Sequence, residues 1–361
     1  MFYPINAMYM QDRKFNPNAL IPDNGNYFGF PLEPEDAALV LISAPWDTTV
    51  STRAGSSYAP DAIIEASRFI DFYEPLAPNS WRKGIATAPI DYSIQDLSHR
   101  LRSDADKIIS LSHSDAEYIF ENRMHERRLR RINEASMSVN DKIYNQAKHW
   151  LKQGKIVGLV GGDQSTAYGN IRAVGEYHEH IGILHIDASC NLKENHYGFT
   201  HSHSSIMHNV LRDVESIDRL VAVGVREFSH AEWERAQSDE RIKLFTGQHI
   251  WSSHFEGVNW STIANEIVDS LPEKVYISLD IDGLTIECSP HTGTTISGGL
   301  RFPEVVYLLG KIVASGRRIV GFDLTEVVPD VDDKTDATIA ARLLFKMCSM
   351  ALKHIESDDV L

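Results

Sequence analysis

The segment Val275–Asp282 constrains the fold of this chain more than any other stretch. Its odd-numbered positions up to Ile281 are all apolar, as in a buried strand, and Asp280 and Asp282 come at its end, one residue apart. Alternate positions of a strand lie on the same face, so we expect both carboxylates to point the same way. Paired carboxylates repel each other unless a cation or a proton lies between them. The segment therefore predicts a sheet with a charged site at the carboxyl end of a strand, where open α/β sheets place their ligands.

Other short apolar runs have the character of buried parallel strands, and helical patterns lie between them. The clearest helical pattern joins Val139, Ile143 and Ala147, with Ser138 as the expected N-cap and Gly154 as the stop. This alternation predicts one three-layer α/β/α domain with a central, mostly parallel sheet, in which residues 1–36 form an N-terminal extension. The remaining strands are expected at Ala37–Ala44, Ile156–Val160, Ile181–Ile186, Leu220–Val225 and Ile319–Phe322.

Composition narrows the class of partner. The chain of 361 residues has a formal net charge of -15, which disfavours nucleic acid and anionic membranes, since both attract basic surfaces. Its three cysteines lack metal-binding spacing, and an odd, sparse set fits a reducing cytoplasm. The polar start of the chain predicts no signal peptide, and no apolar run approaches the length of a membrane span. We therefore expect a cytoplasmic protein.

A group of arginines interrupts the α/β pattern between Arg123 and Arg131. It lies among Glu121, Glu126 and Glu134, which predicts a solvated helix with ion pairs one turn apart. A subunit contact and a site for an anionic ligand are the alternatives.

Several polar motifs follow the predicted strands, and together they resemble those of the ureohydrolase family, which comprises arginase, agmatinase and formimidoylglutamase. The resemblance covers about residues 37–350, and Asp280–Leu300 keeps the spacing of the family's long motif without a gap. The resemblance implies the arginase-like fold. The five matching segments, in order, are Gly161–Gln164, Asp187–Asn191, Ser202–Ser204, Asp280–Leu300 and Glu326–Asp332.

In this family two Mn²⁺ ions activate a water that attacks a guanidinium or formimino carbon. The resemblance implies that Asp187, Asp280 and Asp282 are residual metal ligands. At the other three ligand positions the family has His, His and Asp, whereas this chain has Gln164, Ser189 and Asn191. Neutral oxygens are weaker ligands than carboxylates or imidazoles for this purpose. We therefore expect no cofactor, or as the alternative one or two weakly bound manganese ions.

The resemblance also implies residues that act on the ligand. His203 matches a histidine thought to shuttle protons, and Glu326 matches the acid that pairs with the cationic head of the substrate. His291 replaces a glycine of the long motif and, with Thr292, is expected to lie in the pocket. Simpler interpretations remain open. Asp187 and Asp280 can cap the ends of buried strands, and His203 can be an ordinary loop histidine.

The replaced positions have their own alternatives. Gln164 and Asn191 are expected to fill the vacated site as hydrogen-bonding groups, because buried carboxylates without cations must be bonded or protonated. A histidine near the motif is an alternative source of a ligand, and Cys190 is expected to pack in the core with no nucleophilic role. The histidines concerned are His185, His196 and His201.

Three functional hypotheses follow. The first is a non-catalytic or strongly impaired ureohydrolase homologue that binds a small cationic amidine or guanidine. The second is an active hydrolase of linear C–N bonds that uses a single or atypical metal ion. The third is a non-catalytic subunit that associates with an active paralogue. If the chain does not associate with a paralogue, the resemblance implies a homo-oligomer.

Overall fold

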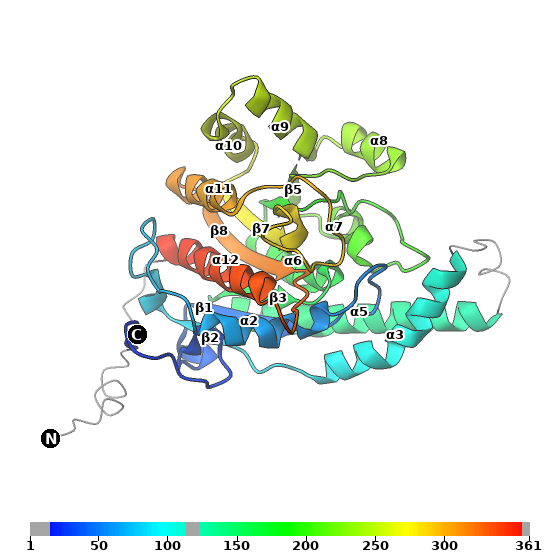
Figure 1. The fold of residues 1–361 in the computed structure, drawn as a ribbon, viewed down its shortest axis with the longest axis horizontal. Coiled ribbons are helices and arrows are strands. Elements are labelled where there is room, and N and C mark those ends of the chain that lie inside the picture. The colour runs from blue at the N-terminus through cyan, green and yellow to red at the C-terminus, as the bar shows by residue number, and fades with distance from the viewer. Residues whose placement is uncertain (1–14, 113–122, 356–361) are drawn as a thin grey trace.

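We describe a computed structural model of the chain for residues 15–112 and 123–355. Eight strands form one sheet in the order β2-β1-β3-β8-β7-β4-β5-β6, and every recorded pairing is parallel. Helices cover both faces of this sheet (Figure 1). The predicted three-layer α/β architecture is therefore confirmed. The strands are β1 (Leu39–Ala44), β2 (Ile85–Thr87), β3 (Ile156–Gly161), β4 (Ile181–Ile186), β5 (Ile217–Val223), β6 (Ile242–Phe245), β7 (Lys274–Asp280) and β8 (Arg318–Thr325).

Alternation along the strands divides the core into two parts. In β1, Leu39 and Leu41 belong to one buried cluster, whereas Val40 and Ile42 belong to the other. The first cluster includes residues of α2 (Ala59–Ser67), α9 (Gly247–Phe255), α10 (Trp260–Asp269), α11 (Phe302–Ala314) and α12 (Thr335–Ala351). The second includes residues of α3 (Ser93–Ser112), α5 (Arg123–Leu151), α6 (Ala167–His178), α7 (Ile206–Asp213) and α8 (His230–Ser238).

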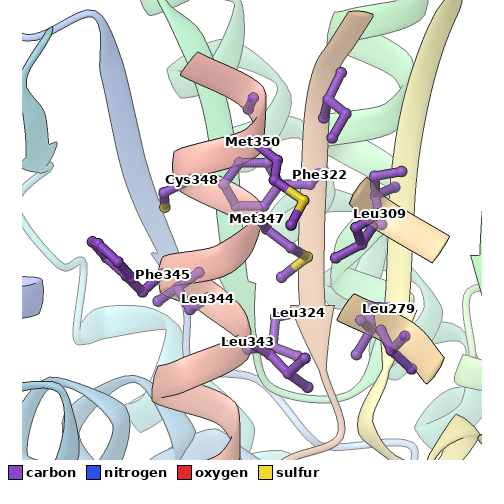
Figure 2. Close-up of a cluster of buried hydrophobic side chains, with 14 of the residues drawn as sticks. Leu279, Leu309, Phe322, Leu324, Leu343, Leu344, Phe345, Met347, Cys348 and Met350 are labelled. Atoms are coloured by element: carbon purple, nitrogen blue, oxygen red, sulfur yellow. The ribbon is translucent and has the colours of Figure 1, made fainter. Parts of the chain in front are cut away.

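Helix α12 packs against strand β8 through large apolar side chains. Figure 2 shows Leu343, Met347 and Met350 of α12 directed at Phe322 and Leu324 of β8. All five side chains are fully buried and belong to the first cluster. Full burial of a side chain of this size contributes about 1.5–3 kcal/mol. This contact anchors β8, which ends immediately before Glu326.

Three details of the sequence prediction were wrong. The helix predicted from Ser138 begins at Arg123, so Ser138 lies inside α5, although Gly154 ends the helical turn with a φ of 76° as expected. Strand β5 begins at Ile217, three residues before the predicted start. The short edge strands β2 and β6 were not predicted.

The arginine group lies at the start of α5, where Arg128 and Arg131 pair with Asp104 of α3. The ion pairs described for this group thus join two helices, whereas the sequence had suggested pairs within one. Glu121 lies outside the described residues. Within the described part of the chain, no helix combines the length and apolar character that crossing a bilayer requires.

Candidate functional site

Four neighbouring strands deliver the predicted site residues to one edge of the sheet. In the strand order β3-β8-β7-β4, the carboxyl ends lead directly to Gln164, Glu326, Asp280 and Asp187. The alternation of β4 and β7 places their polar residues on the face covered by α6, because the intervening Ile186 and Leu279 belong to the opposite core cluster. Parallel strands therefore bring together residues that are far apart in sequence.

Asp187, Asp280 and Asp282 form one compact carboxylate cluster. One oxygen of each lies within 4.8 Å of those of the other two, and all three side chains are buried. The strand ends at Asp280, so Asp282 does not continue it but lies in a short 3₁₀ turn, Ile281–Gly283. That turn still directs Asp282 to the cluster, because its backbone N–H donates to Asp280 Oδ1 at 2.9 Å.

Backbone N–H groups hold the other two carboxylates. The N–H of Ala188 donates to Asp282 Oδ1 at 3.0 Å, and that of Ser189 donates to Asp187 Oδ1 at 2.5 Å. These donors favour the charged form, but burial opposes it more strongly and raises the pKa of each of the three carboxyls. Repulsion from Asp282 raises the pKa of Asp187 and Asp280 further.

Two of the three replaced ligand positions form a hydrogen-bonded chain to this cluster. Asn191 Nδ2 donates to Gln164 Oε1 at 2.6 Å and to Asp187 Oδ2 at 2.8 Å. Asn191 holds a left-handed backbone with a φ of 54°, which asparagine tolerates better than most residues. The amide group thus presents donors to Asp187, where a metal ligand would present a lone pair.

Gln164 connects the cluster to Glu326. Its backbone N–H donates to Glu326 Oε1 at 2.9 Å, and its side chain is fully buried. Its Nε2 has no hydrogen-bond partner among the described residues. Burial raises the pKa of Glu326, and the nearby Asp163 raises it further.

His185 lies directly below Asp187 on the same strand face. Its Nε2 is 3.3 Å from Asp187 Oδ2, but neither ring nitrogen makes a hydrogen bond of good geometry within the described structure. Burial lowers the pKa of His185 to about 3, so the ring is neutral and the contact is not an ion pair. Of the three histidines considered as substitute ligands, His185 contacts the cluster and His196 lines the cavity described next, whereas His201 lies in an edge contact with Tyr168.

A cavity of about 480 Å³ opens over the carboxylate cluster, and we call it the central cavity. The predicted residues His203, Thr292 and Ser189 line it together with Glu326. Burial lowers the pKa of His203 to about 3, and His196 lowers it further. The lining also includes Val50, Ser51, Thr52, Asp187, Asn191, Lys193, His196, Tyr197, Ser204, Glu227, Phe228, Ser229, Glu232, Asp280, Asp282, Gly293 and Thr294.

His291 is directed away from the central cavity. Its Nδ1 lies 2.7 Å from Asp336 Oδ2, and its backbone N–H donates to Asp336 Oδ1 at 3.1 Å. The adjacent Thr292 turns inward and donates from Oγ1 to the backbone oxygen of Glu326 at 2.9 Å. Thr292 thereby holds Glu326, whose backbone has a left-handed φ of 61°.

Three charged residues of the lining, Lys193, Glu227 and Glu232, were not singled out from the sequence. They lie in loops or at a helix start after strands, and the positive φ of Asn191 breaks the alternation that would have located Lys193. The lining contains six carboxylates and one lysine, so the central cavity is acidic.

Comparisons with known proteins agree with this fold and with membership of one enzyme family. The family model described as "Arginase family" matches residues 37–349. The chain is 28% identical to the N(1)-aminopropylagmatine ureohydrolase of Thermus thermophilus over 327 residues, covering 90% of this chain and 92% of that protein. It is 26% identical to the agmatinase of Bacillus subtilis over 318 residues, covering 87% and 91% of the two chains.

Among solved structures, proclavaminate amidino hydrolase from Streptomyces clavuligerus superposes with a TM-score of 0.70 at 21% identity. The match covers 94% of this chain and all 100% of that one. At this identity the likeness supports the fold.

Proposed function

Because the chain belongs to the arginase family, we propose that it keeps the family's ligand cavity but lacks a working binuclear manganese centre. In this proposal it is a non-catalytic or strongly impaired homologue that binds a small cationic amidine or guanidine. The relatives named above are ureohydrolases and agmatinases, which by their names act on guanidino compounds.

The hydrogen bonds of Asn191 are the observation that carries this proposal. A metal ligand must offer a lone pair, but Asn191 offers N–H groups to both Gln164 and Asp187. The bond from Asn191 to Gln164 also occupies Gln164 Oε1, and this oxygen is the only atom of the Gln164 side chain that could ligate a metal ion. The donor set at these positions therefore fits a self-contained polar network better than it fits two divalent ions.

Binding of a cation is supported by the charges that remain. Six carboxylates line the central cavity, and Glu326 among them stands at the position that the family resemblance assigns to the substrate's cationic head. An organic cation would offset the repulsion between buried carboxylates without requiring imidazole ligands. The retained acids thus support the proposal that the cavity binds a cation.

A second candidate function rests on the carboxylate cluster alone. The three clustered oxygens, all within 4.8 Å of one another, offer ligand atoms for a single hard cation. In this alternative the chain hydrolyses a linear amidine with one metal ion, and Asp280→Ala abolishes turnover.

Turnover assays of wild type and of a variant with the family's six metal ligands restored distinguish the two candidate functions. Wild type and Gln164→His/Ser189→His/Asn191→Asp are loaded with Mn²⁺ and assayed for urea or ammonia release from arginine, agmatine and formimidoylglutamate. The proposal predicts no turnover by wild type above the Asp280→Ala background, and measurable turnover only after restoration. Robust turnover by wild type that Asp280→Ala removes would refute the proposal and support the single-metal alternative.

A further inference from the structure

His291 makes contacts that the proposed function does not use, although the adjacent Thr292 lines the central cavity. Its ring Nδ1 lies 2.7 Å from Asp336 Oδ2, and its backbone N–H donates to Asp336 Oδ1 at 3.1 Å. An ionised carboxylate only accepts hydrogen bonds, so Nδ1 carries the proton between the two side chains. The side chain of Asp336 is fully buried, and His291 therefore occupies both oxygens of a buried acid.

The same ring also contacts the connection between β8 and α12, which begins with Glu326. His291 Nε2 lies 4.0 Å from Asp330 Oδ2, and that oxygen accepts from Arg53 Nη2 at 3.1 Å. Asp330 comes four residues after Glu326, and Asp336 lies in the first turn of α12. His291 thus contacts this connection near its start and again at its end.

Thr292 links the loop of His291 directly to Glu326. Its Oγ1 donates to the backbone oxygen of Glu326 at 2.9 Å, and the backbone N–H of Glu326 donates to the backbone oxygen of Gly162 at 2.8 Å. Glu326 has a left-handed φ of 61°, a conformation that is unfavourable for a residue with a Cβ. The bond from Thr292 therefore stabilises a backbone that Glu326 would not adopt by itself.

The carboxyl group of Glu326 follows from this backbone. Its Oε1 accepts from the N–H of Gln164 at 2.9 Å, whereas no partner of Oε2 is recorded among the described residues. Oε2 lies beside Gly293, since a Cβ built there would be 3.8 Å from it, and the backbone oxygen of Gly293 accepts from Thr52 Oγ1 at 2.5 Å. A shift of residues 291–293 would therefore displace the oxygen that is available to a cation.

We propose that the His291–Asp336 pair positions Glu326 for the cationic end of the ligand, and that it acts through Thr292. His291 is then a positioning residue that does not touch the ligand. It stands where the family's long motif has a glycine, which has no side chain to reach Asp336. The inference rests on the proposed function, because that function assigns the ligand's cation to Glu326, but the position of Glu326 can be measured without a ligand.

Hydrogen exchange of the Gln164 amide reports the position of Glu326, because this N–H donates to Glu326 Oε1. The amides of Gly162 and Asp163 donate to backbone oxygens at the end of β1 and just after it, so they serve as references in the same peptide. Full-length protein in EDTA is analysed by mass spectrometry with fragmentation that resolves single amides.

We expect His291→Leu to speed exchange of the Gln164 amide about tenfold relative to the reference amides, as the loss of one hydrogen bond provides. Thr292→Val, which removes only the hydroxyl, should have the same effect. The double variant should exchange no faster than either single variant, because both act on one linked contact. His291→Asn should keep the wild-type rate, since its Nδ2–H can replace the ring Nδ1–H.

Titration calorimetry with agmatine in EDTA measures the consequence for binding. The affinity should fall about tenfold in His291→Leu and in Thr292→Val, and it should stay at the wild-type value in His291→Asn. His254→Leu is the matched control, because the His254 side chain is 18% exposed, against 20% for His291, and its Nε2 lies 3.7 Å from Glu304 Oε1. It should leave both the Gln164 exchange rate and the agmatine affinity unchanged.

Three results would overturn the proposal. They are an unchanged Gln164 rate in Thr292→Val or in a folded His291→Leu, an equal increase in His254→Leu, and a failure of His291→Asn to keep the wild-type rate. Agmatine that bound neither wild type nor any variant would instead refute the proposed function, while the exchange rates would still show whether His291 positions Glu326.

Discussion

Replacing Asn191 by aspartate tests the polar network directly, because the change removes two donors and adds a fourth carboxyl beside the cluster. In wild type, Nδ2 lies 2.6 Å from Gln164 Oε1 and 2.8 Å from Asp187 Oδ2. An aspartate there either points a charged oxygen at two acceptors or binds a proton to keep one hydrogen bond.

Protonation of the new aspartate sets an upper limit on the loss in free energy of unfolding. Protonating an aspartate of pKa about 3.9 at pH 7 costs about 4 kcal/mol, and an unprotonated one loses hydrogen bonds worth about 1 kcal/mol each and adds repulsion. We therefore expect Asn191→Asp to lower the free energy of unfolding by about 2–4 kcal/mol in EDTA at pH 7. The loss should shrink as the pH falls toward 4, where the new carboxyl binds a proton without cost.

Urea denaturation in EDTA, and again with excess Mn²⁺, measures this effect. Manganese should recover stability in Asn191→Asp, since the new carboxylate can ligate a cation. Asn140→Asp is the matched control, because Asn140 is equally buried and donates to Ser136 and accepts from Gly169, so that neither of its partners is a carboxylate. It should lose stability without a response to manganese. An Asn191→Asp variant within 0.5 kcal/mol of wild type in EDTA, a threshold set by ordinary surface changes of about that size, would refute the network account.

Two further predictions concern stability alone. Burial raises the pKa of Asp323 to about 7 from 3.8, so its stabilising contribution is complete below pH 3.8 and is lost as the pH rises through 7. The unfolding free energy of Asp323→Asn, measured relative to wild type, should therefore rise by up to about 4 kcal/mol between pH 4 and pH 8, and a constant difference would contradict the burial effect. Gly162→Ala would bring a Cβ to 2.0 Å from the backbone oxygen of Trp46, so we expect a loss of about 3 kcal/mol or more by urea denaturation. Gly293→Ala, whose Cβ would meet nothing closer than 3.4 Å, should change stability by less than about 1 kcal/mol, and equal losses in the two variants would exclude the steric explanation.

Most of the fold could be predicted from the apolar runs in the sequence. Long central strands such as β7 and β4 are apolar on both faces because helices cover both, and this continuous burial is readable in one sequence. The edge strand β6 has only four residues and an exposed Lys243, so its pattern does not differ from that of a loop. The start of α5 was missed because its first turns are charged and mostly exposed.

The candidate site was predictable where strands end and unpredictable where loops turn. Asp187 and Asp280 follow from alternation, and Cys190 lies buried in the second core cluster as expected, with burial raising its pKa to about 12. The left-handed backbone of Asn191 breaks the alternation, so the sequence could not locate Lys193 in the cavity. His291 was expected in the pocket, but pairing with Asp336, a residue 45 positions later, directs it elsewhere.

The stoichiometry of bound manganese tests the central claim most directly. Wild-type protein is incubated with excess Mn²⁺, desalted and analysed for metal by mass spectrometry, with the Gln164→His/Ser189→His/Asn191→Asp variant treated in parallel. The account predicts near-zero manganese per wild-type chain and a clear gain in the variant. Two tightly held ions in wild type would contradict it, because Gln164, Ser189 and Asn191 would then have to act as ligands.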